Sequence, residues 1–132
     1  MGFRVAAETV KHMIKKGQKI EGSNVLVLGI TFKENCPDIR NSRVIDVIQE
    51  FWTYNCEVDV YDPWADIDEV REEYGLELIK EKNNLSTYDA IVAAVNHREF
   101  DALNLSQYSK NGATVVYDIK GALPKDNVDA RV

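Results

Sequence analysis

Val25-Leu26-Val27-Leu28 is a short run that is apolar on both faces, and Gly29 follows it directly. Such a run is typical of a strand inside a parallel sheet, because helices cover both faces of that kind of sheet. We therefore expect residues 25–28 to form a central strand. The polar segment from Gly29 to Asn41 would then be a loop at the carboxyl end of that strand.

The chain on either side of this run alternates between helical and strand patterns. Helices are expected at about residues 3–16, 42–54 and 67–74, and further strands at 58–61, 76–79, 90–95 and 114–119. Parallel neighbours need crossover connections, and right-handed crossovers place helices on both faces of a sheet. The pattern predicts a three-layer α/β/α Rossmann-like domain with a mostly parallel sheet of about five strands, preceded by an N-terminal helix.

Two of the expected helices have recognisable apolar stripes and ends. The first has its stripe at Phe3, Ala7, Val10 and Ile14 and stops at Gly17. It must bury that stripe on its own domain, on another domain or on a second subunit, and the sequence leaves these three open. The second helix should be capped by Asn41 or Ser42, with Trp52 on its buried stripe.

The composition limits the classes of ligand that the chain can bind and indicates its cellular compartment. A chain of 132 residues with 45% hydrophobic content can bury one core of ordinary size. The formal charge of −6 provides no overall positive field for nucleic acid or an acidic membrane. The longest apolar runs, such as Ala90–Val95, are too short to cross a bilayer, and the start of the chain lacks a signal peptide. We expect a cytoplasmic protein in which Cys36 and Cys56 are free thiols.

Ligands of open α/β sheets gather at the carboxyl ends of the strands, which directs attention to the loops 29–41, 62–65 and 120–125. The first loop has a single glycine where a dinucleotide fingerprint has three, so it lacks the signature of an NAD site. Lys33 and Arg40 flank a helix N-terminus, an arrangement that suits a phosphate. Two alternatives stay open: Lys33 is a solvated surface residue, and Arg40 pairs with Asp38.

Other reactive side chains have simpler interpretations. Asp62 is expected to form the turn before Pro63, and His12 and His97 to be surface residues, since neither has a second metal ligand at suitable spacing. Cys36 could be an activated nucleophile near a helix N-terminus, but no histidine lies near it in the sequence to act as a base. Cys56 is expected to be a small packed residue. Trp64 could cover the sheet end or a partner domain.

The loop itself resembles a known family motif. Residues Gly29–Ser42 follow the pattern G-x-x-F-K-x-x-x-x-D-x-R-x-S of the UDP-glucose/GDP-mannose dehydrogenase family. The resemblance to the C-terminal domain of that family continues through Val58–Pro63, Tyr88–Ala93 and Tyr117–Gly121. Many members have Thr at the position of Cys36. The local sequence Asn35–Asn41 is most similar to that of the branch that acts on UDP-N-acetylglucosamine or UDP-N-acetylmannosamine for capsule and Vi-type polysaccharides.

The resemblance implies a function for the chain. The family oxidises the C6 hydroxyl of a nucleotide sugar to a carboxylate in two hydride transfers to NAD, through a thiohemiacetal on a cysteine. It implies that residues 1–17 end an interdomain or dimerisation helix and that residues 18–132 form the UDP-sugar-binding domain. Catalytic residues and most of the NAD site would then lie in other domains of a homodimer or higher homo-oligomer.

The same resemblance implies the binding residues. Lys33 would contact the nucleotide by charge, and Phe32 would lie beside the base. Lys120 stands where many members have Arg, so its phosphate contact would be a point charge and not a planar fork. Arg40 completes the predicted substrate-binding set.

Two other functions compete with this one. The chain could be a free-standing nucleotide sensor without catalysis, although its helical start without a leading strand disfavours this. It could also be a self-contained NAD dehydrogenase, which the missing glycines disfavour.

Overall fold

A six-stranded parallel sheet forms the centre of the computed structural model, which describes residues 2–110, 114–119 and 129–131. The strands are β1 (Asn24–Leu28), β2 (Glu57–Tyr61), β3 (Leu78–Ile79), β4 (Ala90–Ala93), β5 (Val115–Asp118) and β6 (Ala130–Arg131). Their order is β3-β2-β1-β4-β5-β6. β1 pairs in parallel with β2 and with β4, so the prediction of a central strand is confirmed.

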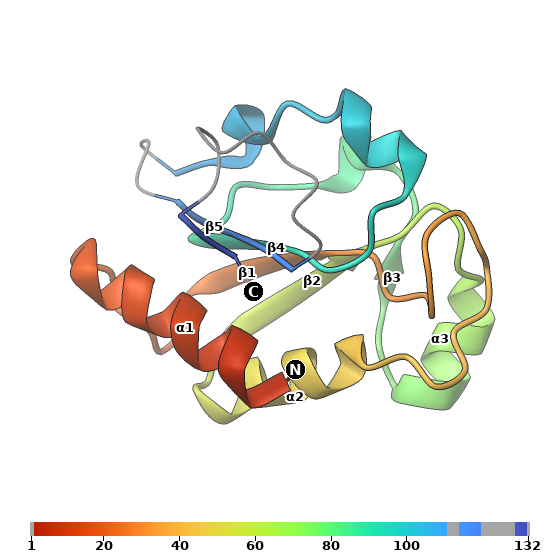
Figure 1. The fold of residues 1–132 in the computed structure, drawn as a ribbon, viewed down its shortest axis with the longest axis horizontal. Helices are drawn as coiled ribbons and strands as arrows, with labels where there is room; N and C mark the ends of the chain where they lie inside the picture. The colour runs from red at the N-terminus through yellow and green to blue at the C-terminus, as the bar shows by residue number, and fades with distance from the viewer. Residues whose placement is uncertain (1, 111–113, 120–128, 132) are drawn as a thin grey trace.

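Helices cover one face of the sheet and short 3₁₀ helices cover the other (Figure 1). The first layer contains α1 (Gly2–Lys15), α2 (Val44–Thr53) and α3 (Ile67–Tyr74). The second contains η1 (Lys82–Asn84), η2 (Arg98–Ala102) and η3 (Leu105–Tyr108). Because side chains alternate along a strand, Val25 and Val27 pack in the first layer while Leu26 and Leu28 pack in the second. The predicted three-layer, Rossmann-like fold is confirmed.

The stripe of α1 differs from the predicted one. Its buried apolar residues are Val5, Ala6, Val10 and Met13, and α1 packs on α2 and β5 of its own domain. Ala7 is exposed and Ile14 is 60% exposed. Both residues were predicted to lie on the buried stripe, and the prediction is wrong because the helix is rotated toward Val5 and Met13. The side chain of Phe3 lies outside what the structure describes.

The start of α2 also differs from the prediction. Asn41 has a φ of 60°, in the left-handed region that Asn tolerates, and the N-cap position is taken by Arg43 without a side-chain bond. The hydroxyl of Ser42 accepts a hydrogen bond from the N–H of Val44, which is a local turn contact.

Trp52 is 40% exposed, although it was predicted to be core. The buried residues of α2 are Val44, Val47, Ile48 and Phe51, a complete stripe that leaves the next position at its edge. No helix among the described residues is long and apolar enough to cross a bilayer.

Candidate functional site

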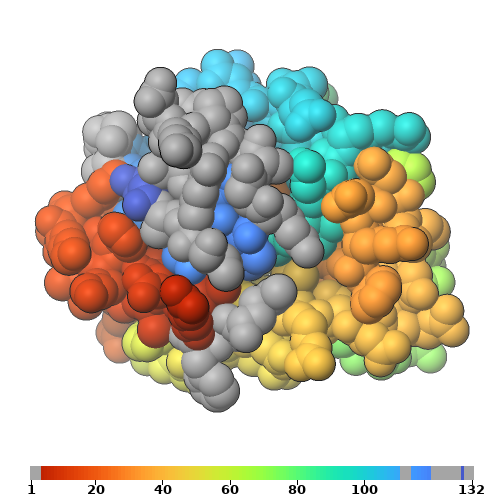
Figure 2. Space-filling model, viewed as in Figure 1, coloured from red at the N-terminus to blue at the C-terminus, as the bar shows by residue number. Residues whose placement is uncertain are grey.

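The strand order reverses between β1 and β4, and in such sheets the crevice at this switch point is the usual place for a ligand. The loop 29–41 leaves β1 here, beside the segment that follows β4 (Figure 2, orange and teal). The two segments touch at Gly29, which has a φ of 93° and whose Cβ, if present, would lie 2.5 Å from Cβ of Val95. A glycine is therefore required at the start of this loop. The segment after β4 is not among the predicted loops.

Asp62, at the end of β2, joins the loops that follow β1 and β2. Its side chain is fully buried. Oδ1 accepts hydrogen bonds from the N–H groups of Trp64 and Ala65 at 2.7 and 3.1 Å, so the predicted turn former is confirmed. Oδ2 accepts from the N–H groups of Ile30 and Thr31 at 2.7 and 3.3 Å, which is a further role.

These bonds keep Asp62 ionised. Burial is the largest single influence and raises the pKa of its carboxyl group, but His97 and the N–H groups of Ile30 and Trp64 together lower it more, so the pKa lies below its ordinary value. A buried carboxylate that accepts several bonds is a fixed anchor for the backbone around it.

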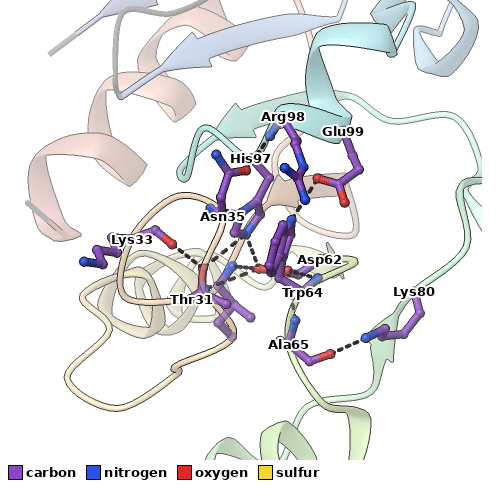
Figure 3. Close-up of polar contacts among 11 residues, drawn as sticks. Thr31, Lys33, Asn35, Asp62, Trp64, Ala65, Lys80, His97, Arg98 and Glu99 are labelled. Carbon is purple, nitrogen blue, oxygen red and sulfur yellow. Dashed lines mark hydrogen bonds and ion pairs between the residues drawn. The ribbon is translucent and has the colours of Figure 1, made fainter.

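His97 is the second anchor, and the prediction that it is a surface residue is wrong, because its side chain is fully buried. Nδ1 accepts a hydrogen bond from the N–H of Asn35 at 2.9 Å, and Nε2 lies 2.9 Å from Oδ2 of Asp62 and 3.1 Å from Oγ1 of Thr31 (Figure 3). A backbone N–H can only donate, so Nδ1 carries no proton and Nε2–H is the donor. The hydroxyl of Thr31 in turn donates to the carbonyl of Lys33.

Aromatic rings cover this buried cluster at the end of the sheet. Trp64 stacks on His97 with ring centroids 6.1 Å apart, and Phe100 meets the same imidazole edge-on at 5.4 Å. Trp64 is itself held by Glu99, which accepts from its Nε1–H at 2.8 Å, and by the guanidinium of Arg98, 5.0 Å from the ring centroid. Of the two options left open, Trp64 covers the sheet end.

Phe32 and Lys33 project from the outside of the same loop. Phe32 is 56% exposed, an unusual position for a large apolar ring. Lys33 is exposed, and no acidic side chain in the described part of the chain pairs with its ammonium group. Figure 3 shows its side chain directed away from the Asp62–His97 cluster while its carbonyl faces Thr31. The predicted Lys120 lies outside the described residues.

Arg40 is engaged at the other end of the loop. Its Nε and Nη2 donate to the two oxygens of Asp38 at 3.0 and 3.1 Å, so the predicted pairing of these residues is confirmed. The bond to Asp38 raises the pKa of Arg40 and lowers that of Asp38. Arg40 also lines an open depression with three carboxylates of α3, those of Glu69, Glu72 and Glu73. This surface is acidic, which disfavours a phosphate there unless Arg40 leaves Asp38.

The cysteines are both free, as predicted. Cys56 is buried and its sulfur accepts from the hydroxyl of Ser23 at 3.3 Å. Cys36 is half-buried, and although no histidine lies near it in the sequence, the fold brings His97 to its neighbour Asn35. Both ring nitrogens of His97 are already bonded, however, so the imidazole is not free to act as a base for Cys36.

The loop after β1 does not fit an NAD pyrophosphate. The second and third glycines of a fingerprint would fall at Thr31, which is buried and bonded to His97, and at Glu34. α2 begins only at Val44, so its N-terminus does not follow the strand directly as the fingerprint requires. No group of three or more His, Cys, Asp or Glu side chains within the described ranges could hold a metal ion.

Known proteins share both the sequence and the fold. Residues 26–125 match the model of the UDP-glucose/GDP-mannose dehydrogenase family, UDP binding domain. The chain is 48% identical over its whole length to a UDP-N-acetyl-D-glucosamine 6-dehydrogenase of Salmonella typhi, of which it covers 31%. It is 40% identical to the enzyme of the same name from Pseudomonas aeruginosa, again over its whole length and over 32% of the relative.

A solved structure of a related dehydrogenase has the same fold. The NDP-N-acetyl-D-galactosaminuronic acid dehydrogenase of Methanosarcina mazei superimposes with a TM-score of 0.76 at 22% identity, over 92% of this chain and 26% of the other. The chain thus spans about a third of the length of the curated relatives it matches. The matched motif, the shared fold and the full-length identity show that this chain belongs to the UDP-glucose/GDP-mannose dehydrogenase family and carries its UDP binding domain.

Proposed function

We propose that this chain binds the UDP part of a UDP-sugar in an NAD-dependent UDP-sugar 6-dehydrogenase. The enzyme would oxidise the C6 hydroxyl to a carboxylate in two steps and so make a UDP-uronic acid for polysaccharide synthesis. The family assignment and the relatives named UDP-N-acetyl-D-glucosamine 6-dehydrogenase support this activity. NAD and the catalytic cysteine would be supplied by parts of the enzyme outside this chain, since the loop after β1 does not fit a dinucleotide.

The observation that carries the proposal is the exposed pair Phe32 and Lys33 on a loop with buried anchors. An ammonium group that no acidic side chain of residues 2–110, 114–119 or 129–131 pairs with is available to a diphosphate, and an exposed ring beside it can pack on a base. The loop is already held by hydrogen bonds from buried groups to Ile30, Thr31 and Asn35, so it loses less conformational entropy when the ligand binds.

The remaining predicted ligand residues contribute in different ways. Lys120 is proposed to add a second point charge to the diphosphate. Arg40 is proposed as a weaker contact, because its guanidinium must first exchange Asp38 for the ligand. The proposed substrate is a UDP-N-acetylhexosamine, in line with the names of the relatives at 48% and 40% identity.

The arrangement of the whole enzyme is part of the same proposal. Residues 1–17 would end an interdomain or dimerisation helix, and the enzyme would be a homodimer or a higher homo-oligomer. A cytoplasmic location is consistent with the two free cysteines, since a reducing compartment keeps thiols free.

Replacing Lys33 tests the proposal. In the full-length enzyme, Lys33→Ala should weaken UDP binding about 10-fold to 100-fold, the loss expected for one hydrogen bond to a charged group. Isothermal titration with UDP measures this directly. Lys11→Ala removes another exposed lysine, from α1, and is the matched control, with no change expected. Unchanged UDP affinity in Lys33→Ala would refute the role proposed for this loop.

A further inference from the structure

We propose that His97 is a positioning residue for nucleotide binding: its neutral imidazole holds the segment that carries Phe32 and Lys33 in its binding conformation. This rests on the proposed function. The histidine touches no ligand in this proposal. It acts chiefly through Asn35, whose N–H donates to it. Thr31, on the other side of the exposed pair, contacts the imidazole but is also held by Asp62.

The loop has few other attachments. Within the described part of the chain, residues 32–38 make just two hydrogen bonds to residues outside the loop 29–41, and both involve Asn35. Its N–H donates to Nδ1 of His97 at 2.9 Å, and its Oδ1 accepts from the N–H of Arg98 at 2.9 Å. Asn35 has a φ of 54°, a left-handed conformation in which its N–H and side chain both meet the segment after β4. Inside the loop, the N–H of Phe32 also donates to the carbonyl of Asp38. The position of Lys33 therefore depends on the attachment at Asn35, on Thr31 and on this bond across the loop.

Thr31 supplies the second link to His97. Its Oγ1 lies 3.1 Å from Nε2 of His97 and donates its own proton to the carbonyl of Lys33 at 2.9 Å. The backbone of Lys33 is thus fixed from its amino side by a residue in contact with the imidazole. The same Nε2–H points to Oδ2 of Asp62 at 2.9 Å, so the imidazole bridges the ends of β1, β2 and β4 (Figure 3).

The bridge works in one protonation form. Asn35 presents a donor and Asp62 presents an acceptor, so the imidazole must accept at Nδ1 and donate at Nε2. Three charged groups stand near it: the Asp62 carboxylate bonded to it, and Arg98 and Glu99, both held against Trp64. No free ring nitrogen is left for proton transfer, which is why His97 is assigned to positioning and not to catalysis.

Two conservative variants separate the halves of the bridge. His97→Asn can place its amide oxygen near the site of Nδ1 and keep an acceptor for Asn35. His97→Gln can place its amide nitrogen near the site of Nε2 and keep a donor for Asp62. Because positioning runs chiefly through Asn35, the full-length His97→Gln enzyme should bind UDP about tenfold more weakly, and His97→Asn should stay within about threefold of the wild type.

The kinetic and exchange readouts should follow the same division. In His97→Gln the KM for the UDP-sugar should rise while kcat and the KM for NAD stay within about twofold, as expected when binding alone is lost. Hydrogen exchange at the Asn35 amide should also accelerate. Equal UDP affinities in His97→Gln and wild type, or equal losses in both variants, would overturn the proposal.

Controls separate positioning from general stability and from the proposed function. Met13→Ala removes a fully buried side chain of α1 and destabilises the domain away from the loop, so it should leave UDP affinity unchanged. If the affinity loss followed the melting temperature across Met13→Ala and the His97 variants, the role would be structural only. If Lys33→Ala bound UDP normally, the proposed function would fail first. If Lys33→Ala weakened binding and His97→Gln did not, this inference alone would fail.

A measurement on the wild type does not depend on how the variants fold. Nitrogen NMR of the enzyme labelled with ¹⁵N-histidine should show, at neutral pH, an imidazole with a bare Nδ1 and a proton on Nε2. A proton on Nδ1 of His97 would overturn the bridge.

Discussion

The two halves of the loop from Gly29 to Asn41 are held by different chemistry. In the first half, Thr31 and Asn35 are bonded to His97, 66 and 62 positions away in the sequence, and the groups that hold them are fully buried. In the second half, Arg40 is bonded to Asp38, two residues away, on an exposed surface. Exposed ion pairs compete with water and are screened by dissolved salt. A buried group that loses its hydrogen bond has no water to replace the partner. The first half therefore gives Lys33 a fixed base. In the second half, Ile39 is buried and its carbonyl accepts from the hydroxyl of Tyr74, so only the exposed Asp38–Arg40 pair is easily exchanged.

The largest expected effect comes from Asp62. Its carboxylate accepts from four backbone N–H groups and from His97, so Asp62→Asn turns an acceptor into a group with two unwanted donors. We expect the free energy of unfolding to fall by about 3 kcal/mol. Urea denaturation measures this loss.

The pH dependence of unfolding gives the matching control. The folded-state pKa of Asp62 lies below its ordinary value of 3.8, so its contribution to stability is complete above that value and is lost as the pH falls through the folded pKa. In Asp62→Asn, the free energy of unfolding should therefore fall less steeply with decreasing pH in the acid range. An equally steep fall of the unfolding free energy in both proteins would show that other carboxyl groups cause the acid destabilisation.

Gly29 should come next. A Cβ atom at this position would lie 2.5 Å from Cβ of Val95, and the substituted residue would also have to adopt a φ of 93°. We expect Gly29→Ala to lower the free energy of unfolding by about 2 kcal/mol and to separate the loop from the segment after β4. Gly17→Ala, also at positive φ but with nothing nearby, should cost less in the same thermal melts. Equal losses would mean that backbone conformation alone, and not the contact with Val95, requires the glycine.

The smallest effect should come from Arg40. Both partners of the Asp38–Arg40 pair face solvent, so Arg40→Ala should leave the melting temperature unchanged. It should also weaken UDP binding less than Lys33→Ala does, because its contact with the ligand must replace Asp38. A drop in melting temperature as large as that of Gly29→Ala would contradict the view that the Asp38–Arg40 pair contributes little to stability.

The sheet could be predicted from sequence because local patterns determine it. The apolar run around Leu26 and the acidic stretch of α3 have signals that lie within a few residues, and both elements form where expected. β6 has two residues and no apolar pattern, so its pairing with β5 had no local signal. Trp52 shows the limit of periodicity, since the stripe is already complete at Phe51.

The site was predictable in part. The residues of the loop motif could be found through their family resemblance, but the buried cluster behind them could not. His97 is buried by contacts with Thr31, Asn35 and Asp62, which lie 35 to 66 positions away, and nothing in its own neighbourhood marks it as core. One signal was available: His97 follows a buried strand next to the central one, and ligand sites in open sheets form where such strands end.

A crystal structure of the full-length enzyme with UDP would show directly whether this loop binds the nucleotide. We expect the diphosphate at the carboxyl ends of β1 and β4, with an oxygen within hydrogen-bond distance of Nζ of Lys33 and the base against Phe32. A diphosphate bound at another edge of the sheet, with Lys33 still in solvent, would contradict it.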